Sequence, residues 1–204
     1  MKPEDTDQYV GRGGLKLRYA IEHLALNVRG LVAADFGCNI GGFTDCLLKK
    51  GARRVYAFDT GYGALHWKLR NDHRVVVMER TNAMHVALPE RVDLVVVDVG
   101  WTRQRHILPN ALRQLSERGF ILSLFKPQYE ADRPLVRRGV VPPENVQLVL
   151  DTSLAQLKGM GIAVESVLRL PRLKGMKNQE CMLYILGAKC VPKEDFLPEG
   201  PREN

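Results

Sequence analysis

A glycine-rich segment between an apolar strand-like run and a helical pattern constrains the fold of this chain more than any other feature. It covers residues 34–44 and reads ADFGCNIGGFT. In an open α/β sheet, ligands bind at the loops that follow the carboxyl ends of the strands. Glycines let such a loop turn tightly and approach a ligand closely, and the N–H groups of the next helix favour an anionic group. The segment therefore predicts an α/β domain, in which this loop either binds a ligand or is a structural turn.

The remaining sequence alternates strand-like and helical patterns, which indicates βαβ units around a mostly parallel sheet. Strands are expected at residues 31–36, 54–58, 75–78, 94–97 and 120–125, and helices at residues 13–26, 44–50, 64–70, 104–117 and 142–158. Residues 163–168 and 182–186 look like a closing antiparallel pair. We therefore predict a flexible N-terminus at residues 1–8, one α/β domain over residues 9–190, and a disordered tail at residues 191–204.

Length and composition narrow the class of protein. The 204 residues suffice for one buried core, and 45% hydrophobic with 26% charged residues is typical of a globular domain. No apolar run approaches the ~20 residues of a membrane span, and the polar N-terminus is unlike a secretory signal. The four cysteines form no CxxC pair and no metal-ligand set. We expect no metal, no membrane contact, and buried reduced thiols in a cytoplasmic protein.

A second signal follows the glycine loop by about 20 positions. The strand-like run VYAFD ends in Asp59, whose carboxylate can accept both hydroxyls of a ribose. The alternative is that Asp59 caps a helix or forms a turn. The loop spacing G-x-x-x-G-G differs from the dinucleotide fingerprint G-x-G-x-x-G, which disfavours a nicotinamide dehydrogenase. The methionine carboxylate of S-adenosylmethionine would also suit the anion-binding helix start.

Several short segments resemble the catalytic domain of the TlyA family, within the FtsJ-like group of RNA ribose 2′-O-methyltransferases. They are YVGRGGLKL at residues 9–17, GGFTD at 41–45, DTGYG at 59–63, WKLR at 67–70, ERTN at 79–82, DV at 98–99, FKPQYE at 125–130 and NQE at 178–180. The resemblance spans residues 9–187. It implies a class I methyltransferase fold: a doubly wound, Rossmann-like, mostly parallel seven-stranded sheet with one antiparallel strand. It also implies S-adenosylmethionine as cofactor and RNA as substrate.

The FtsJ-like group uses a Lys-Asp-Lys-Glu tetrad, and the matching positions here are Lys16, Asp98, Lys126 and Glu180. Lys126 follows the apolar run FILSLF, so its charge lies at a buried strand end, where an unpaired charge is costly. We expect Lys126 to accept or steer the proton of the attacking hydroxyl. The other three have simpler interpretations: a solvated side chain for Lys16, a supporting hydrogen-bond acceptor for Asp98, and an edge-strand solubility residue for Glu180.

The cofactor is expected to contact residues of the loop and of the neighbouring strand ends. These residues are Asp35, Gly37, Asn39, Gly41, Gly42, Phe43, Asp59, Asn82 and Asp98. Asn82 is nearly as well explained as a turn residue. Tyr62 and Trp67 either stack on the cofactor or a base, or pack in the core or against a loop.

The formal net charge of +7 favours polyanionic partners, because neutralised phosphates release counterions. Basic residues cluster at positions 49–54, 133–138 and 169–177, and the last two clusters adjoin the predicted tetrad. We expect RNA, such as ribosomal RNA or a ribosomal subunit, to bind there. The family usually carries an N-terminal S4-type RNA-binding module. The 204 residues leave no room for one, so we expect a partner protein to supply RNA targeting.

The chain departs from the family pattern at three places. Cys38 and Asn39 replace small and hydroxyl residues of the loop, Gly100-Trp101 replaces Ser-Phe, and Lys177 replaces a glycine. We expect these changes to bear on cofactor affinity or substrate choice. Two rival functions therefore stay open: a methyltransferase with a non-RNA substrate, and a non-catalytic protein that binds the cofactor or RNA.

Overall fold

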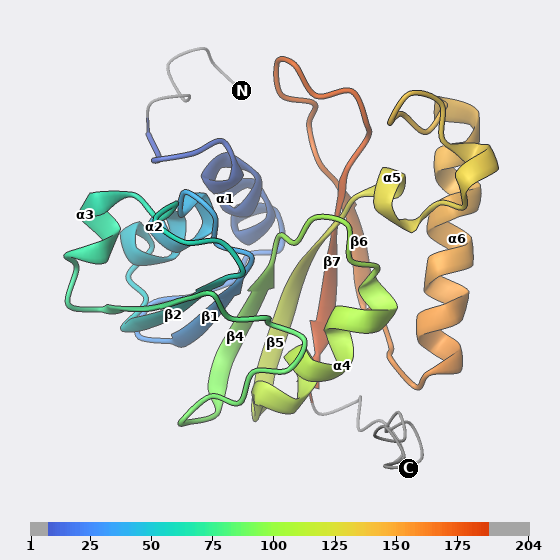
Figure 1. Ribbon diagram of the computed structural model, residues 1–204. Coiled ribbons are helices and arrows are strands. Elements are labelled where there is room, and N and C mark those ends of the chain that lie inside the picture. Colours follow the sequence, from blue (N-terminus) through green and yellow to red (C-terminus); the bar gives the residue numbers. More distant parts are fainter. Residues whose placement is uncertain (1–7, 188–204) are drawn as a thin grey trace, which may run out of the picture.

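The computed structural model describes residues 8–187, in which seven strands form one sheet of order β3-β2-β1-β4-β5-β7-β6 (Figure 1). The strands are β1 (Val32–Phe36), β2 (Arg54–Asp59), β3 (Val75–Glu79), β4 (Val92–Val97), β5 (Leu115–Phe125), β6 (Ser166–Arg169) and β7 (Cys181–Leu186). β7 runs antiparallel to both its neighbours, and the other pairs are parallel. The predicted sheet with one antiparallel strand is confirmed. Residues 1–7 and the predicted tail lie outside the described residues.

Helices cover both faces of this sheet (Figure 1). On one face lie α1 (Gly13–His23), α2 (Gly42–Lys49) and α3 (Trp67–Arg70), and on the other lie α4 (Gln104–Gln114) and α6 (Pro143–Gly159). The short α5 (Pro127–Glu130) and a 3₁₀ turn (Arg133–Leu135) follow β5. None of the helices within residues 8–187 is both long and apolar enough to cross a membrane.

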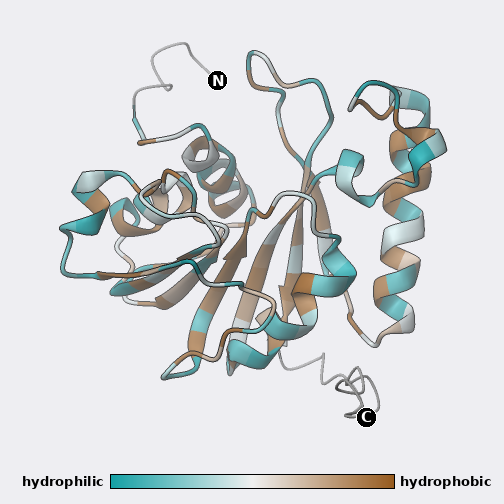
Figure 2. Cartoon of the chain, viewed as in Figure 1, coloured by the Kyte–Doolittle hydropathy of each residue, from teal (hydrophilic) through white to brown (hydrophobic). Residues whose placement is uncertain are grey.

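Strand β4 shows how the core is divided between the two faces. Leu94 and Val96 pack in the cluster beneath α1 and α2, whereas Val95 and Val97 pack in the cluster beneath α4 and α6. All four side chains are fully buried, and each contributes about 1.5–3 kcal/mol of hydrophobic stabilisation. Figure 2 shows the apolar strands enclosed between helices whose outer faces are polar. An apolar run without alternation is the expected pattern of a central parallel strand.

The structure corrects three predicted helix boundaries. The helix expected over residues 104–117 ends at Gln114, because Leu115 adopts an extended conformation and already pairs with Val92. The register then shifts, and Phe120 pairs with Leu94. The first helix ends at His23 instead of residue 26, where Ala25 takes a left-handed φ of 50°. The third helix is confined to Trp67–Arg70.

The described cysteines are free and buried: Cys38, Cys46 and Cys181. Burial raises the pKa of the Cys46 thiol to about 12, so the thiol is protonated and unreactive at neutral pH. Cys190 lies outside the described residues. Within residues 8–187 no group of three His, Cys, Asp or Glu side chains is placed to hold a metal ion.

Candidate active site

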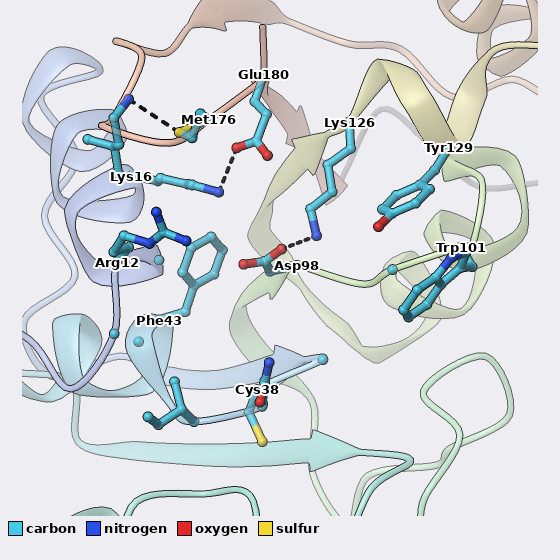
Figure 3. Close-up of a pocket in the computed structure, with 18 of the residues that line it drawn as sticks. Arg12, Lys16, Cys38, Phe43, Asp98, Trp101, Lys126, Tyr129, Met176 and Glu180 are labelled. Atoms are coloured by element: carbon cyan, nitrogen blue, oxygen red, sulfur yellow. Dashed lines mark hydrogen bonds and ion pairs between the residues drawn. The ribbon is translucent and has the colours of Figure 1, made fainter. Parts of the chain in front are cut away.

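Two ion pairs face one cavity at the carboxyl edge of the sheet (Figure 3). Lys126 Nζ lies 2.5 Å from Asp98 Oδ1, and Lys16 Nζ lies 2.6 Å from Glu180 Oε2. All four side chains line the cavity, whose volume is about 500 Å³. The predicted tetrad positions are therefore neighbours in space, although they are distant in the sequence.

The sheet topology explains this convergence. Asp98 follows β4 and Lys126 follows the adjacent parallel strand β5, so both leave the sheet at the same edge. Glu180 comes just before β7, and because β7 is antiparallel its start lies at this edge too. Cys181 is paired with Phe125, which puts Glu180 beside Lys126 across the two strands. Lys16 reaches the cavity from α1 (Figure 3).

The side chains of these residues are largely withdrawn from water. The exposed fractions are 14% for Lys16, 10% for Glu180, 15% for Lys126 and 24% for Asp98. Lys126 Nζ also donates a hydrogen bond to the carbonyl of Val99 at 3.1 Å. The interpretation of Lys16 as a solvated side chain is therefore wrong, because only 14% of that side chain is exposed. The interpretation of Glu180 as an edge-strand residue is also wrong, because β7 is an interior strand. Withdrawing charged pairs from water costs desolvation energy, so such pairs contribute little to stability. Two of them in one cavity therefore indicate a functional site.

The start of helix α1, which carries Lys16, packs directly against the glycine loop. A Cβ on Gly42 would come within 2.9 Å of Gly14 N and 3.1 Å of Gly11 O. The carboxylate of Asp45 in α2 accepts a hydrogen bond from Val10 N at 2.9 Å. Glycine at residue 42 thus permits the contact that ties the position of Lys16 to the loop.

The loop itself is held against β2 and β4. The N–H groups of Gly37 and Cys38 both donate to the carbonyl of Phe58, at 3.0 and 2.8 Å. Gly37 has a φ of 87°, and a Cβ there would lie 2.8 Å from Asp98 O. Gly41 has a φ of 98° and faces Leu69 of α3. Gly37, Asn39, Gly42 and Phe43 line the cavity, whereas Gly41 does not.

Asp35 lies beneath the loop and is fully buried. Its Oδ2 accepts hydrogen bonds from Thr44 N at 3.0 Å and Thr44 Oγ1 at 2.7 Å. Burial raises the pKa of this carboxyl to about 7, against the opposing effect of the Thr44 hydrogen bonds. Asp35 does not line the cavity. Its structural role is to anchor the start of α2, which differs from the direct cofactor contact predicted for it.

Asp59 and Asn82 lie outside the cavity lining. Asp59 accepts hydrogen bonds from Asn39 N at 2.8 Å and Gly61 N at 2.7 Å, so it orders both the loop and its own turn. Asn82 is exposed, and its Oδ1 accepts a hydrogen bond from Met84 N at 3.0 Å, as in a turn. Their contacts with a cofactor stay predictions.

Aromatic side chains that were not assigned to the site border the cavity. Trp101 is 87% exposed with a left-handed φ of 55°, and its ring centroid lies 5.7 Å from that of Tyr129. Both line the cavity (Figure 3). Tyr62 and Trp67 are instead 71% and 65% exposed and lie outside it, so they do not pack in the core.

Other lining residues come from segments that flank the predicted tetrad. They include Arg12, Gln128, Leu173 and Met176. Arg12 Nη1 donates to the carbonyl of Lys174 at 3.0 Å, which ties the β6–β7 loop to the start of α1. Arg12 and Gln128 stand four and two positions from predicted tetrad lysines in the sequence. This closeness in the sequence is the one sign that Arg12 and Gln128 could belong to the site, but it does not show which way their side chains point.

Comparison with known proteins identifies the family of this chain. The model of the family described as FtsJ-like methyltransferase matches residues 9–187. The 16S/23S rRNA (cytidine-2′-O)-methyltransferase TlyA of Mycobacterium tuberculosis is 45% identical over 199 residues, which cover 96% of this chain and 65% of that protein. Hemolysin A of Brachyspira hyodysenteriae is 35% identical, over 78% of this chain and 72% of that protein.

Solved structures are similar over most of the chain. A protein from Lactococcus lactis is 35% identical with a TM-score of 0.83, and the match covers 90% of this chain and 91% of that one. Fibrillarin from Aeropyrum pernix, solved with bound S-adenosyl-L-methionine, shares the fold at 19% identity with a TM-score of 0.60, over 83% of this chain and 74% of that one.

The chain spans about two thirds of the length of the curated relatives it matches, 65% for the Mycobacterium tuberculosis protein. The family model, in contrast, covers nearly all of the described residues, and its match includes both ion pairs and the glycine loop. This chain belongs to the FtsJ-like methyltransferase family.

Proposed function

We propose that this chain transfers the methyl group of S-adenosylmethionine to a ribose 2′-hydroxyl of RNA, and that the RNA is ribosomal. The observation that carries the proposal is that two partly buried ion pairs, Lys126–Asp98 and Lys16–Glu180, lie in one cavity beside a glycine loop. The Mycobacterium tuberculosis relative named as an rRNA (cytidine-2′-O)-methyltransferase supports the choice of substrate. A ribosomal substrate also favours a cytoplasmic location.

The residues present fit this cofactor. The cavity volume of about 500 Å³ is within the roughly 300–1,000 Å³ typical of small-molecule sites. The cofactor supplies an electrophilic methyl group on a sulfonium. Gly37, Asn39, Gly42 and Phe43 would hold its methionine end, and Asp59 the ribose. Glycine at residue 37 lets the loop pack tightly against the residue that follows β4, because a Cβ there would lie 2.8 Å from the carbonyl oxygen of Asp98.

The protein's share of the reaction is to orient the hydroxyl and to handle its proton. Asp98 and the Val99 carbonyl hold Lys126 Nζ in one place. Lys126 would accept or steer the hydroxyl proton as the oxygen attacks. Lys16 and Glu180 close the opposite wall and restrict how the ribose can lie. Alignment of the attacking oxygen with the methyl group supplies much of the rate, as in other reactions between fixed reactants.

The surroundings of the cavity suit a nucleic acid. The rings of Trp101 and Tyr129 offer faces on which an unpaired base can stack. Basic residues lie on the segments that follow β5 and on the end of β6 and the loop after it, namely Arg133, Arg137, Arg138, Arg169, Arg172, Lys174 and Lys177. Such cations bind phosphates without sequence preference and orient the strand. The partner protein expected to supply RNA targeting stays a prediction.

The test is incubation with labelled S-adenosylmethionine and total RNA from a strain that lacks the gene, followed by mapping of the labelled nucleotide. We expect label on a ribose 2′-oxygen of ribosomal RNA. Lys126→Ala should bind the cofactor but transfer no methyl group, whereas the surface control Lys158→Ala on α6 should match the wild type. Label on a base or on protein would identify another substrate. Cofactor binding without transfer to any substrate would identify a non-catalytic protein.

A further inference from the structure

The amide oxygen of Gln128 is buried and has no hydrogen-bond partner among residues 8–187. Gln128 is the second residue of α5, two positions after Lys126, and it lines the same cavity. A carbonyl oxygen that is buried without a donor loses the hydrogen bonds it makes with water in the unfolded chain, which is unfavourable. Because Gln128 lines the cavity, a turn of its side chain would bring this oxygen within reach of a donor on a ligand there.

The strand order indicates which ligand lies near Gln128. The glycine loop follows β1, whereas Gln128 follows β5, and β4 lies between these two strands. With neighbouring strands about 4.8 Å apart, the loop and the start of α5 are separated by roughly 10 Å. Asp98 and Lys126 lie between them. Gln128 is therefore on the side of the ion pair away from the loop, where the methyl acceptor must lie if the cofactor occupies the loop.

The neighbours of Gln128 on that side are suited to a nucleobase. Tyr129 follows it in α5, and the exposed Trp101 ring lies 5.7 Å from the Tyr129 ring. In a nucleotide, the carbon that carries the base is bonded to the carbon that carries the 2′-hydroxyl. If the 2′-oxygen of a nucleotide lies at Lys126, its base is therefore only a few bonds away and lies close to the same part of the cavity. The amide is then available to the edge of the base, and one of the two rings to a face of it.

We infer, on the basis of the proposed function, that Gln128 is a specificity-determining residue, whose amide oxygen accepts a hydrogen bond from an exocyclic amino group of the target base. Cytosine presents an amino group where uracil presents a carbonyl oxygen. The oxygen of Gln128 attracts the first and repels the second. Sites that bind a substrate through a buried polar group reject analogues that leave this group unpaired.

Two substitutions separate the acceptor from the rest of the side chain. Gln128→Leu removes the amide at similar size, and Gln128→Glu keeps an acceptor oxygen. Gln156→Leu, at an exposed position of α6, is the matched control. The probes are ribosomal RNA from a strain lacking the gene and transcripts that carry either cytidine or uridine at the nucleotide mapped for the wild type. Single-turnover transfer, cofactor affinity and thermal melting are measured for each variant.

We expect the wild type to methylate the cytidine transcript at least tenfold faster than the uridine transcript. Gln128→Leu should reduce this ratio to about twofold and leave the Kd for S-adenosylmethionine within twofold of the wild type. Gln128→Glu should retain the ratio, even if charge repulsion weakens binding of both transcripts. Gln156→Leu should resemble the wild type in every measurement.

Three results would overturn the inference. One is a mapped target whose base has no amino group. Another is a Gln128→Leu enzyme with the same transcript ratio as Gln156→Leu, which would mean that water satisfies the amide. The third is a tenfold weaker Kd for the cofactor with an unchanged ratio, which would assign Gln128 to the cofactor. In all three, the wild type still methylates RNA. A wild type without any RNA methylation refutes the proposed function itself, and the inference with it.

Discussion

Asp35 makes the stability of this fold sensitive to pH, and its replacement by asparagine tests that argument. In the folded state the pKa of this carboxyl is raised from 3.8 to about 7, because the side chain is fully buried. The folded state therefore binds a proton that the unfolded state has lost above about pH 4. For an acid with a raised pKa, the free energy of unfolding falls as pH rises between these two values, by about 1.4 kcal/mol per pH unit.

Between pH 4 and pH 7 the loss from this one group sums to about 4 kcal/mol. Asp35→Asn keeps an oxygen that accepts the hydrogen bonds of Thr44 but cannot ionise. We expect the variant to lose less stability than the wild type between pH 5 and pH 8. Its carboxamide N–H group adds a constant cost, which does not affect the slope. The difference in slope, not the absolute stability, is the measured quantity.

The assay is urea denaturation at several pH values, followed by circular dichroism. Tryptophan fluorescence is less suitable, because Trp67 and Trp101 are 65% and 87% exposed in the folded protein. Asp72→Asn is the control: Arg74 lowers the pKa of Asp72 to about 2, so the control profile should run parallel to that of the wild type above pH 5. Parallel profiles for Asp35→Asn and the wild type would refute the reasoning.

Other consequences of the structure can be tested in the same way. Glu130→Ala should lower the free energy of unfolding by about 1–3 kcal/mol in a denaturation experiment, because the buried carboxylate accepts a hydrogen bond from the first N–H of α4. Glu130→Gln keeps an acceptor oxygen and should retain most of the stability. Gly14→Ala should lower the melting temperature, since a Cβ there would lie 2.4 Å from the Tyr9 ring; Gly159→Ala, in open space at the end of α6, should raise stability by about 0.5–1 kcal/mol. RNA affinity should fall steeply with added salt in a filter-binding titration, and a salt-independent Kd would contradict phosphate contacts by the basic loops.

The sequence sufficed to predict those parts of the site that the sheet order determines. The resemblance assigned Asp98 and Lys126 to one site, and their charged atoms lie 2.5 Å apart because adjacent parallel strands end at one edge of the sheet. Glu180 was assigned in the same way, and the antiparallel direction of β7 accounts for its position. Once the motif positions are assigned, the strand order explains why these three residues are neighbours, without any knowledge of loop conformation.

Features that depend on side-chain direction or on local backbone conformation were not predictable. Trp101 reaches the cavity mouth from a left-handed backbone conformation that is uncommon for a tryptophan. The sequence also gave no sign that Asp35 points beneath the loop instead of into the cavity. Leu115 begins β5 within a polar stretch that has neither helical nor strand periodicity, which explains the misplaced end of α4.

Strand β7 is the last described element in the sequence, yet it lies between β5 and β6 in the sheet. A growing polypeptide that carries Lys16, Asp98 and Lys126 still lacks Glu180 and the strand that follows it. Among the described residues, the lining of the cavity is therefore complete only when β7 lies between two strands that are synthesised before it. We expect a chain cut before β7, which lacks the Lys16–Glu180 ion pair, to show none of the proposed activity.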